Sequence, residues 1–299
     1  MQLDWIEIGA FRSYEAVRFD PEPGVNILLG GNGAGKTNLL EAIDYAATGA
    51  SFRAASDEHL VALGADEGVV RAGFSVGERK VTVEAAIRTV GRNELLMNGK
   101  RLRRRGELTT TLATVVFLPD DLELIKGGPA RRRGFLDALA LRMYPAAGAE
   151  QRSFVRALRQ RNGLLRRGGA IDTRVLDVWD ERLAAAGAAV VARRLRSLEM
   201  LGPRVEAAYR AIAGTSSDTS WEYRSGWASG DENMEVLRTQ LRLVLGDGRR
   251  VDLDRRITTR GPQRDDPVFL VAGRDARTLA SQGEQRSLAL SLRVASHSL

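Results

Sequence analysis

Several residue types are scarce or absent in this chain of 299 residues. There is no cysteine, which excludes disulfide bonds and zinc sites with cysteine ligands. The two histidines, His59 and His297, are too few for a histidine-based metal centre, and both are expected to be structural. No apolar run reaches the roughly 18 residues of a membrane span, and the first residues do not form a signal peptide. A cytoplasmic protein without a membrane-spanning segment is therefore expected.

Lysine is also scarce, because only 4 of the 45 basic residues are lysines and the other 41 are arginines. The net charge is +7 and the isoelectric point is about 10.2, which is compatible with a polyanionic partner. Part of the arginine excess can reflect coding preference, so charge alone does not decide for DNA. The hydrophobic content of 43% and the charged content of 28% are typical of a globular protein, and the length allows about two domains.

A glycine-rich segment near the N-terminus is the first motif with a chemical meaning. Residues 30–37 (GGNGAGKT) fit the P-loop pattern G-x-x-x-x-G-K-[ST] in full. The apolar run 25–29 before them predicts a buried strand, and the pattern from Thr37 onward predicts a helix. Glycines let backbone N–H groups approach phosphates, and the N-terminus of a helix favours anions. The candidate ATP-binding residues are Gly30, Asn32, Gly33, Ala34, Gly35, Lys36, Thr37 and Asn38.

Two of these residues have specific expected roles. Lys36 should reach the β- and γ-phosphates, and the hydroxyl of Thr37 should bind Mg²⁺. ATP and Mg²⁺ are therefore the expected cofactors.

A second polar segment, residues 281–286 (SQGEQR), is typical of the signature helix of ABC-type ATPase heads. Ser281 and Gly283 would lie at a helix N-terminus and could bind the γ-phosphate held by the opposite subunit. Ser281 with Glu284 also fits a capping box, and both interpretations can hold at once. A P-loop and a signature in one chain indicate a dimer that sandwiches ATP between its subunits.

With three further segments, the chain resembles the RecF family of bacterial recombination mediators, which are related to SMC-type heads. The segments are residues 32–42, residues 117–137 (with FLPDDLELIKGGP, RRR and FLD) and residues 261–266 (GPQRDD). The resemblance implies an α/β fold, an ABC-type P-loop ATPase head with an antiparallel β subdomain and a helical second lobe. It also implies that Arg12 approaches the nucleotide.

The same resemblance implies partners and a biological role. They are an ATP-dependent homodimer, single-stranded or gapped duplex DNA, and RecR-like and RecO-like mediators. The role is to assist RecA loading at gaps in DNA repair, replication restart and SOS induction.

The chain departs from the family pattern at two points. Gln263 stands where the family more usually has histidine, and no acidic residue follows Glu284 to serve as the Walker B carboxylate. A weak DNA-dependent ATPase is therefore expected if a Walker B carboxylate is supplied, whereas this chain alone is expected to bind ATP without hydrolysis. Another SMC-type head and a P-loop kinase of a small metabolite are the other hypotheses.

An apolar run ending in acids, residues 115–121, suggests two interpretations. Asp120 or Asp121 could serve a metal, but Pro119 argues against a central strand that runs into these acids. The other interpretation is a strand that leads into a loop near the nucleotide.

The organisation along the chain predicts three parts: residues 1–129 as an ATPase lobe, 130–250 as a mainly helical lobe, and 251–299 as a return to the ATPase lobe. Residues 69–76 and 80–87 are expected to form neighbouring strands, and Asn98-Gly99 is a strong turn signal. Apolar spacing from residue 130 to 213 predicts helices without a long coiled coil.

Several basic and aromatic clusters allow a functional and a structural interpretation. Residues Lys100, Arg101, Arg103, Arg104 and Arg105 form either a DNA-binding patch or a solvated loop. Residues 131–133 (RRR) are expected to be structural. The arginines Arg156, Arg159, Arg166 and Arg167 are expected to form a solvated face. The aromatic residues Trp221, Tyr223 and Trp227 are expected to belong to a strand core, with stacking on bases as the alternative.

Overall fold

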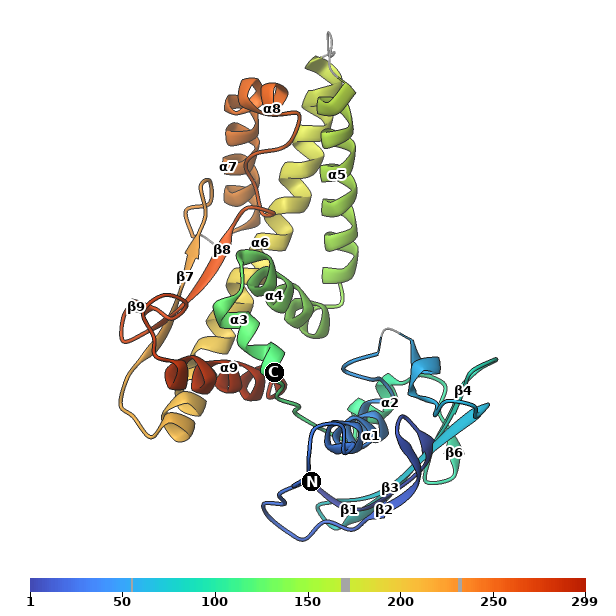
Figure 1. Ribbon diagram of the computed structural model, residues 1–299. Helices are drawn as coiled ribbons and strands as arrows, with labels where there is room; N and C mark the ends of the chain where they lie inside the picture. Colours follow the sequence, from blue (N-terminus) through green and yellow to red (C-terminus); the bar gives the residue numbers. More distant parts are fainter. Residues whose placement is uncertain (55, 168–172, 231–232) are drawn as a thin grey trace. The chain divides into compact units, whose positions relative to one another are not determined.

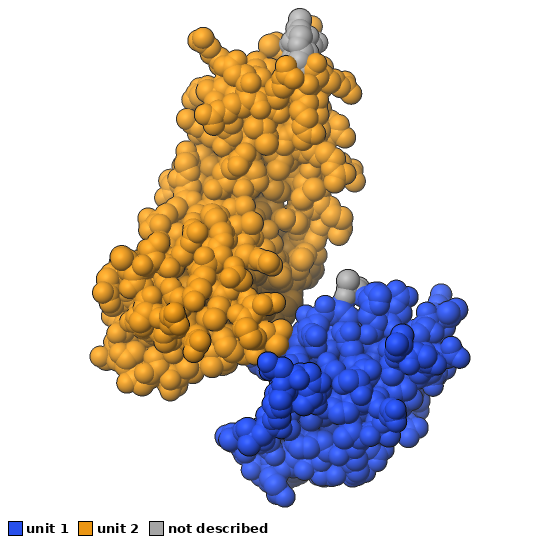
Figure 2. Space-filling model, viewed as in Figure 1, with its two compact units in different colours: residues 1–116 blue, residues 117–299 orange. Residues whose placement is uncertain are grey.

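The computed structural model describes residues 1–54, 56–167, 173–230 and 233–299 (Figure 1). The chain divides into two compact units, residues 1–116 and 117–299, each with its own core (Figure 2). The division lies ahead of the expected boundary at residue 129. No division is seen at residue 250, because the last part of the chain packs within the second unit.

The first unit is an antiparallel sheet with a helix against one face. The sheet has the strand order β2-β1-β3-β4-β5-β6. Its strands are β1 (Gln2–Phe11), β2 (Tyr14–Phe19), β3 (Glu67–Val76), β4 (Arg79–Arg88), β5 (Glu94–Met97) and β6 (Lys100–Arg101). Its helices are α1 (Lys36–Thr48), the 3₁₀ helix η1 (Asp57–Leu60) and α2 (Gly106–Thr109).

Local sequence explains this sheet well. The two central strands β3 and β4 alternate buried and exposed residues and meet in a hairpin, as predicted. Asn98 and Gly99 both have positive φ, 51° and 74°, which is the geometry of the tight turn that Asn-Gly favours. The inner face carries Ile6, Phe74 and Val83 into a core that α1 closes with Leu39, Tyr45 and its alanines.

The outer face of the sheet carries an alternating row of charges. In register across β2, β1, β3 and β4 lie Arg18, Glu7, Arg71 and Glu84. Arg18 donates to Glu7 at 2.5 Å, and Arg71 lies 3.4 Å from Glu84. Opposite charges on facing strands stabilise the pairing and leave this face close to neutral.

The second unit is mostly helical, with one small sheet of order β7-β8-β9. Its helices are η2 (Pro119–Leu122), α3 (Glu123–Lys126), α4 (Pro129–Met143), α5 (Ala147–Arg167), α6 (Thr173–Ala213), α7 (Met234–Asp247), α8 (Arg249–Arg255) and α9 (Gln282–His297). Its strands are β7 (Thr219–Arg224), β8 (Asp266–Val271) and β9 (Arg274–Asp275).

Helix α6 is the centre of this unit. Its 41 residues pack against α5 and α7 toward one end and against α4, β7 and α9 toward the other (Figure 1). Its apolar residues fall into two clusters: Leu183 and Val191 face α7, whereas Leu198 and Leu201 face α9. The helical second lobe is thus as predicted.

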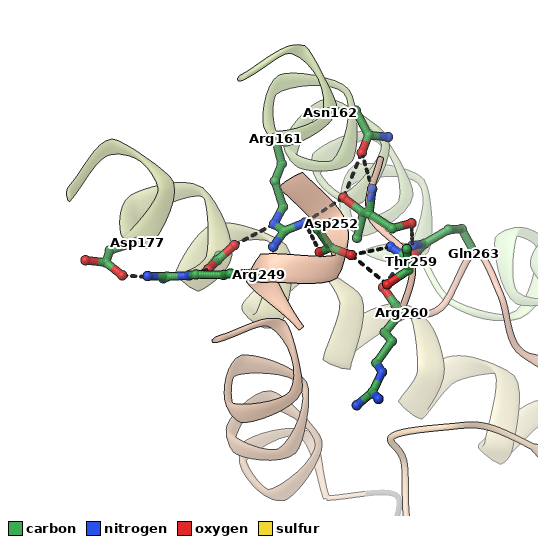
Figure 3. A network of polar contacts seen from close by, with 10 residues as sticks. Arg161, Asn162, Asp177, Arg249, Asp252, Thr259, Arg260 and Gln263 are labelled. Atoms are coloured by element: carbon green, nitrogen blue, oxygen red, sulfur yellow. Dashed lines mark hydrogen bonds and ion pairs between the residues drawn. The ribbon is translucent and has the colours of Figure 1, made fainter. Parts of the chain in front are cut away.

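A buried polar network ties three helices to the segment before β8 (Figure 3). Arg161 of α5 is fully buried and donates to Asp180 of α6 at 2.5 Å and to Asp252 of α8 at 2.6 Å. Asp252 also accepts from the backbone N–H and hydroxyl of Thr259. Because a buried guanidinium is costly unless it is paired, these contacts fix the helices in one arrangement.

Two predictions of strands are wrong. Residues 25–29 form no strand, and Val25, Ile27 and Leu29 are 91%, 76% and 88% exposed. Residues 115–118 also form no strand. A strand needs a neighbour for its backbone hydrogen bonds, and no described strand pairs with either segment. No helix in the described part of the chain has the length and apolar character to cross a membrane.

Candidate nucleotide-binding site

The P-loop has the backbone that its glycines predict. Gly33 and Gly35 have φ of 82° and 89°, a region that side chains disfavour. Gly35 is also tightly enclosed, since a Cβ there would lie 2.9 Å from the hydroxyl oxygen of Tyr14. That hydroxyl donates to the carbonyl of Gly35 at 3.2 Å. Only glycine fits this position, and the first residue of β2 supports the loop.

The donors of the loop face an open surface. Residues 30–34 are exposed, and α1 begins at Lys36, so its first N–H groups lack an intrahelical acceptor. The Nζ of Lys36 donates to the carbonyls of Gly30 and Gly31, each at 2.7 Å. A bound phosphate would give this amine and these N–H groups stronger, charged acceptors.

The donor set also suits the expected metal. Thr37 is exposed in the first turn of α1, where its hydroxyl could join phosphate oxygens around a hard cation such as Mg²⁺. Among the described residues, no cluster of three or more histidines or acids could hold a metal alone.

Arg12 lies beside the P-loop helix with its guanidinium engaged. It donates to both carboxylate oxygens of Glu41, at 3.0 and 2.9 Å, and to the carbonyl of His59 at 2.8 Å. Glu41 is fully buried on α1 and also accepts from Ser51 at 2.5 Å. Arg12 thus anchors the β1–β2 turn to α1, and an approach to the nucleotide stays a prediction.

Arg53 is a candidate that the motifs did not reveal. Its Nη1 donates to Asn38 Oδ1 at 3.1 Å and lies 3.5 Å from Glu41, while the side chain stays 44% exposed. Asn38 in turn donates to Ser13 at 2.8 Å. A cation is thus held over the first turn of α1, where the P-loop motif expects phosphates. Fifteen residues separate Arg53 from Asn38, so no local spacing could indicate the contact.

The signature segment forms the capping box that its sequence predicts. Ser281 precedes α9, its Oγ accepts from the N–H of Glu284 at 3.2 Å, and its N–H donates to Glu284 Oε2 at 2.7 Å. The hydrogen bond from the Ser281 backbone holds the pKa of Glu284 below its usual value. Ser281, Gln282 and Gly283 remain exposed, so the serine hydroxyl and two free N–H groups face outward.

The buried side of the signature helix α9 is held by hydrogen bonds and by apolar packing. The buried Gln285 donates to the carbonyls of Ala276 and Arg277, at 2.9 and 3.1 Å. Leu288 and Leu292 pack into the core beside α6. The exposed N-terminus of α9 therefore sits on a rigid support.

Of the two acids after residues 115–118, Asp121 has a structural role. Asp121 is buried, accepts from the N–H of Leu118 at 2.8 Å and forms an ion pair with Arg293 of α9. Asp120 is exposed. The interpretation of either as a metal-site acid finds no support in these contacts, because the carboxylate of Asp121 is already used.

The segment 261–266 contains a buried acid, Asp265, that accepts hydrogen bonds from residues 223–227. Asp265 accepts from Tyr223 Oη at 2.9 Å, Ser225 Oγ at 2.9 Å and Trp227 Nε1 at 3.0 Å. Burial raises the pKa of Asp265, although these hydrogen bonds oppose the rise. Trp227 and Tyr223 are therefore held as core residues, and stacking on bases is not supported.

The arginine clusters separate into two classes. Arg132 is buried and donates twice to Asp266, at 2.8 and 3.0 Å, and Arg133 donates to the carbonyl of Asp265 at 2.6 Å. These two are structural, as predicted. The predicted solvated face consists of exposed residues, namely Arg156, Arg159, Arg166 and Arg167.

The predicted DNA-binding patch is brought together only in part. A hollow in the first unit is lined by Arg101, Arg103, Arg104 and Arg105, whereas Lys100 does not line it. Arg88 and Arg92, which sequence reasoning did not include, line it as well. They come from the end of β4 and the turn after it, so only the folded sheet brings them near residues 101–105.

Comparison with known proteins places the chain among ATPase heads. Residues 2–299 match the family model described as RecF/RecN/SMC N terminal domain. A protein of Kineococcus radiotolerans named DNA replication and repair protein RecF is 38% identical over the whole chain and 81% of that relative. A protein of the same name from Heliobacterium modesticaldum is 39% identical over 99% of the chain and 80% of that relative.

Solved structures agree with the sequence relatives. The structure of the recombination mediator protein RecF-ATPrS in the RecFOR pathway superposes with a TM-score of 0.74, 30% identity and coverage of 99% of this chain and 80% of that chain. An SMC head bound to the C-winged helix domain of ScpA, 18% identical, has a TM-score of 0.51 over 99% of this chain and 76% of that chain. The latter supports only the fold, which is the ABC-type head that the sequence predicted.

Proposed function

The chain belongs to the RecF/RecN/SMC family, and we propose that it is an ATP-gated, DNA-binding recombination mediator. In this proposal the P-loop of one subunit and the signature helix of another enclose each ATP. The names of its relatives support a role in DNA replication and repair. The observation that carries the proposal is that the P-loop and the N-terminus of α9 are both present and exposed in the same chain.

Each element has a defined part in the proposed cycle. Lys36 would exchange the carbonyls of Gly30 and Gly31 for the β- and γ-phosphates, and Thr37 would orient Mg²⁺. Arg53, held by Asn38, would add positive charge near the terminal phosphate. Ser281 and the free N–H groups of α9 would then bind the γ-phosphate from the other subunit. Binding of ATP would thus stabilise the closed dimer.

The proposed context is assistance of RecA loading at gapped DNA, with RecO-like and RecR-like proteins as partners. A solved neighbour is described as a component of the RecFOR pathway. ATP-driven dimerisation would couple nucleotide state to residence on DNA, so turnover need only be slow.

Sedimentation velocity with and without Mg-ATP tests the sandwich. The wild-type chain should be monomeric without nucleotide and dimeric with Mg-ATP. Lys36→Ala should lose ATP binding and remain monomeric. Ser281→Arg should bind ATP but remain monomeric, because a large cation blocks the N-terminus of α9.

Ser298→Arg is the matched control, since it places the same side chain at the exposed C-terminal end of the same helix. It should dimerise like the wild type. A Ser281→Arg protein that still dimerises with ATP would show that α9 does not close on nucleotide.

A further inference from the structure

The hollow lined by arginines in the first unit is polar and has a volume of about 1080 Å³. Three separate segments form most of it: the start of η1, the end of β4 with the turn after it, and residues 101–105 from the end of β6 onward. Its arginines are Arg88, Arg92, Arg101, Arg103, Arg104 and Arg105, and its acids are Asp57 and Glu58. We call this recess the arginine groove. Positive charge dominates it by six groups to two.

Half of these arginines have acidic partners. Arg88 pairs with Glu67 at 2.7 Å, Arg101 lies 3.5 Å from Glu94, and Arg105 pairs with Asp57. These pairs hold the walls of the groove in place. They also reduce the charge that these three arginines can offer to a ligand.

Arg92, Arg103 and Arg104 have no acidic partner within the part of the chain that the structure describes. All three are exposed and line the groove. All three line one hollow, so their positive charges act together there and favour an anionic ligand. The unpaired charge therefore concentrates in the groove.

The frame beneath these side chains is fixed. The backbone N–H groups of Arg103 and Arg104 both donate to Glu107 Oε1, at 3.0 and 2.9 Å. Asp57 accepts from the hydroxyl of the buried Tyr45 at 3.1 Å and from Asn93 at 2.8 Å. Because Tyr45 belongs to α1, the groove wall is anchored in the core of the unit. The guanidinium groups thus extend from a rigid support.

The chemistry of the lining selects the kind of ligand. None of the described lining residues is aromatic, so the groove offers no platform on which bases could stack. Guanidinium groups suit phosphates because they donate in pairs to phosphate oxygens. The outer face of the sheet is less suited to bind phosphates, since Arg18 and Arg71 are paired there with Glu7 and Glu84.

We propose that the arginine groove binds the sugar-phosphate backbone of DNA, with Arg92, Arg103 and Arg104 as the phosphate ligands. The inference rests on the proposed DNA-binding function and deepens it by placing a contact surface. Recognition through phosphates is independent of sequence, and duplex DNA is sufficient for it. A mononucleotide, with few phosphates, would occupy only part of the groove.

Fluorescence anisotropy with a labelled random-sequence duplex, titrated at several salt concentrations, tests the proposal. Removing two phosphate contacts in Arg103→Ala/Arg104→Ala should flatten the slope of log K against log[salt] by about 1.8. At 0.1 M salt this corresponds to a loss of affinity on the order of 10- to 100-fold. ATP binding should be unchanged, which verifies the fold of the variant.

Arg79→Ala is the matched control. Arg79 is exposed at the opposite end of β4 from Arg88, and no described acid pairs with it. It should change DNA affinity by less than about twofold, since surface charges far from a site contribute little. Equal losses in the control and the groove variant would overturn the groove as the binding surface.

The remaining outcomes show whether the proposal for the arginine groove fails alone or whether the proposed DNA-binding function fails with it. If wild-type protein binds DNA and Arg103→Ala/Arg104→Ala binds it equally well, the groove is excluded while the proposed function stands. If the wild type binds neither duplex nor single-stranded DNA, the proposed function fails as well. In the Lys36→Ala background, pyrophosphate at the same phosphate concentration should not displace DNA. Full displacement would identify a site for small phosphates instead.

Discussion

Arginine has two distinct uses in the two units of this protein. In the second unit, Arg132, Arg161 and Arg194 are at most 3% exposed, and each pairs with a carboxylate at 2.5 to 2.8 Å. In the first unit, Arg92, Arg103 and Arg104 of the arginine groove are exposed, and no described acid pairs with them. The net charge of +7 therefore does not indicate where DNA would bind, whereas the positions of the unpaired arginines do.

The difference follows from the cost of burying charge. A guanidinium removed from water is destabilising unless carboxylates and other acceptors replace its hydration. In the second unit these acceptors come from far along the chain, as Asp252 is 91 residues from Arg161. An exposed guanidinium keeps its water and needs no partner, so it stays available to a ligand.

The largest effect is expected from breaking a buried pair. Arg161→Ala would leave the carboxylate of Asp252 buried without its counter-ion, and Asp180 would keep only Arg249 of its two arginine partners. The expected loss of unfolding free energy is about 3–5 kcal/mol. Urea denaturation followed by tryptophan fluorescence can measure it, because Trp179, Trp221 and Trp227 all lie in the second unit.

Arg159→Ala is the control on the same helix, since Arg159 is exposed. Its effect should stay within about 0.5 kcal/mol, as for most surface substitutions. Similar losses in both variants would mean that burial does not divide the arginines into two classes.

An intermediate effect, on DNA affinity, is expected from releasing one paired arginine, Arg105, from its acidic partner. Asp57 holds Arg105 in the wall of the arginine groove, and Asp57→Asn keeps an oxygen to accept from Tyr45 and Asn93. Arg105 would then be released toward a ligand. DNA affinity should rise about eightfold at 0.1 M salt, the effect of one added phosphate contact.

The control for Arg105 is Glu58→Gln, measured by the same anisotropy titration. Glu58 lines the groove, and among the described residues its carboxylate forms no ion pair with an arginine; its Oε1 lies 4.0 Å from Nε2 of His59. The substitution removes the same charge without releasing an arginine, so affinity should rise less. An equal rise would show that net charge matters rather than a freed arginine.

The sequence predicted those features that depend on neighbouring residues. The P-loop glycines, the Asn98-Gly99 turn, the β3–β4 hairpin and the capping box of Ser281 all follow from short-range geometry. Long-range features could not be predicted in this way. The contact of Arg53 with Asn38 and the entry of Arg92 into the groove depend on which loops the fold brings together.

Residues 25–29 are a case in which a prediction from local sequence was wrong. Their apolar run favours a strand, yet a strand forms only where another strand supplies hydrogen-bond partners. No described strand does so, and the side chains of Val25 and Leu29 stay exposed. Composition thus predicted a tendency of the segment, whereas pairing decides its structure.

The smallest effect, on the pH dependence of stability, is expected from the buried acid Asp265. Burial raises the pKa of Asp265, so the folded state binds a proton there more readily than the unfolded state does. At neutral pH the ionised carboxylate therefore lowers stability relative to a neutral side chain of the same shape. This cost disappears as pH falls from the raised pKa toward the ordinary value of about 3.9. Asp265→Asn can keep the acceptor for Ser225 and Trp227, so the thermal stability of the wild type relative to this variant should increase from pH 7 to pH 4. A difference that instead grows toward high pH would mean that the hydrogen bonds to Asp265 outweigh its burial.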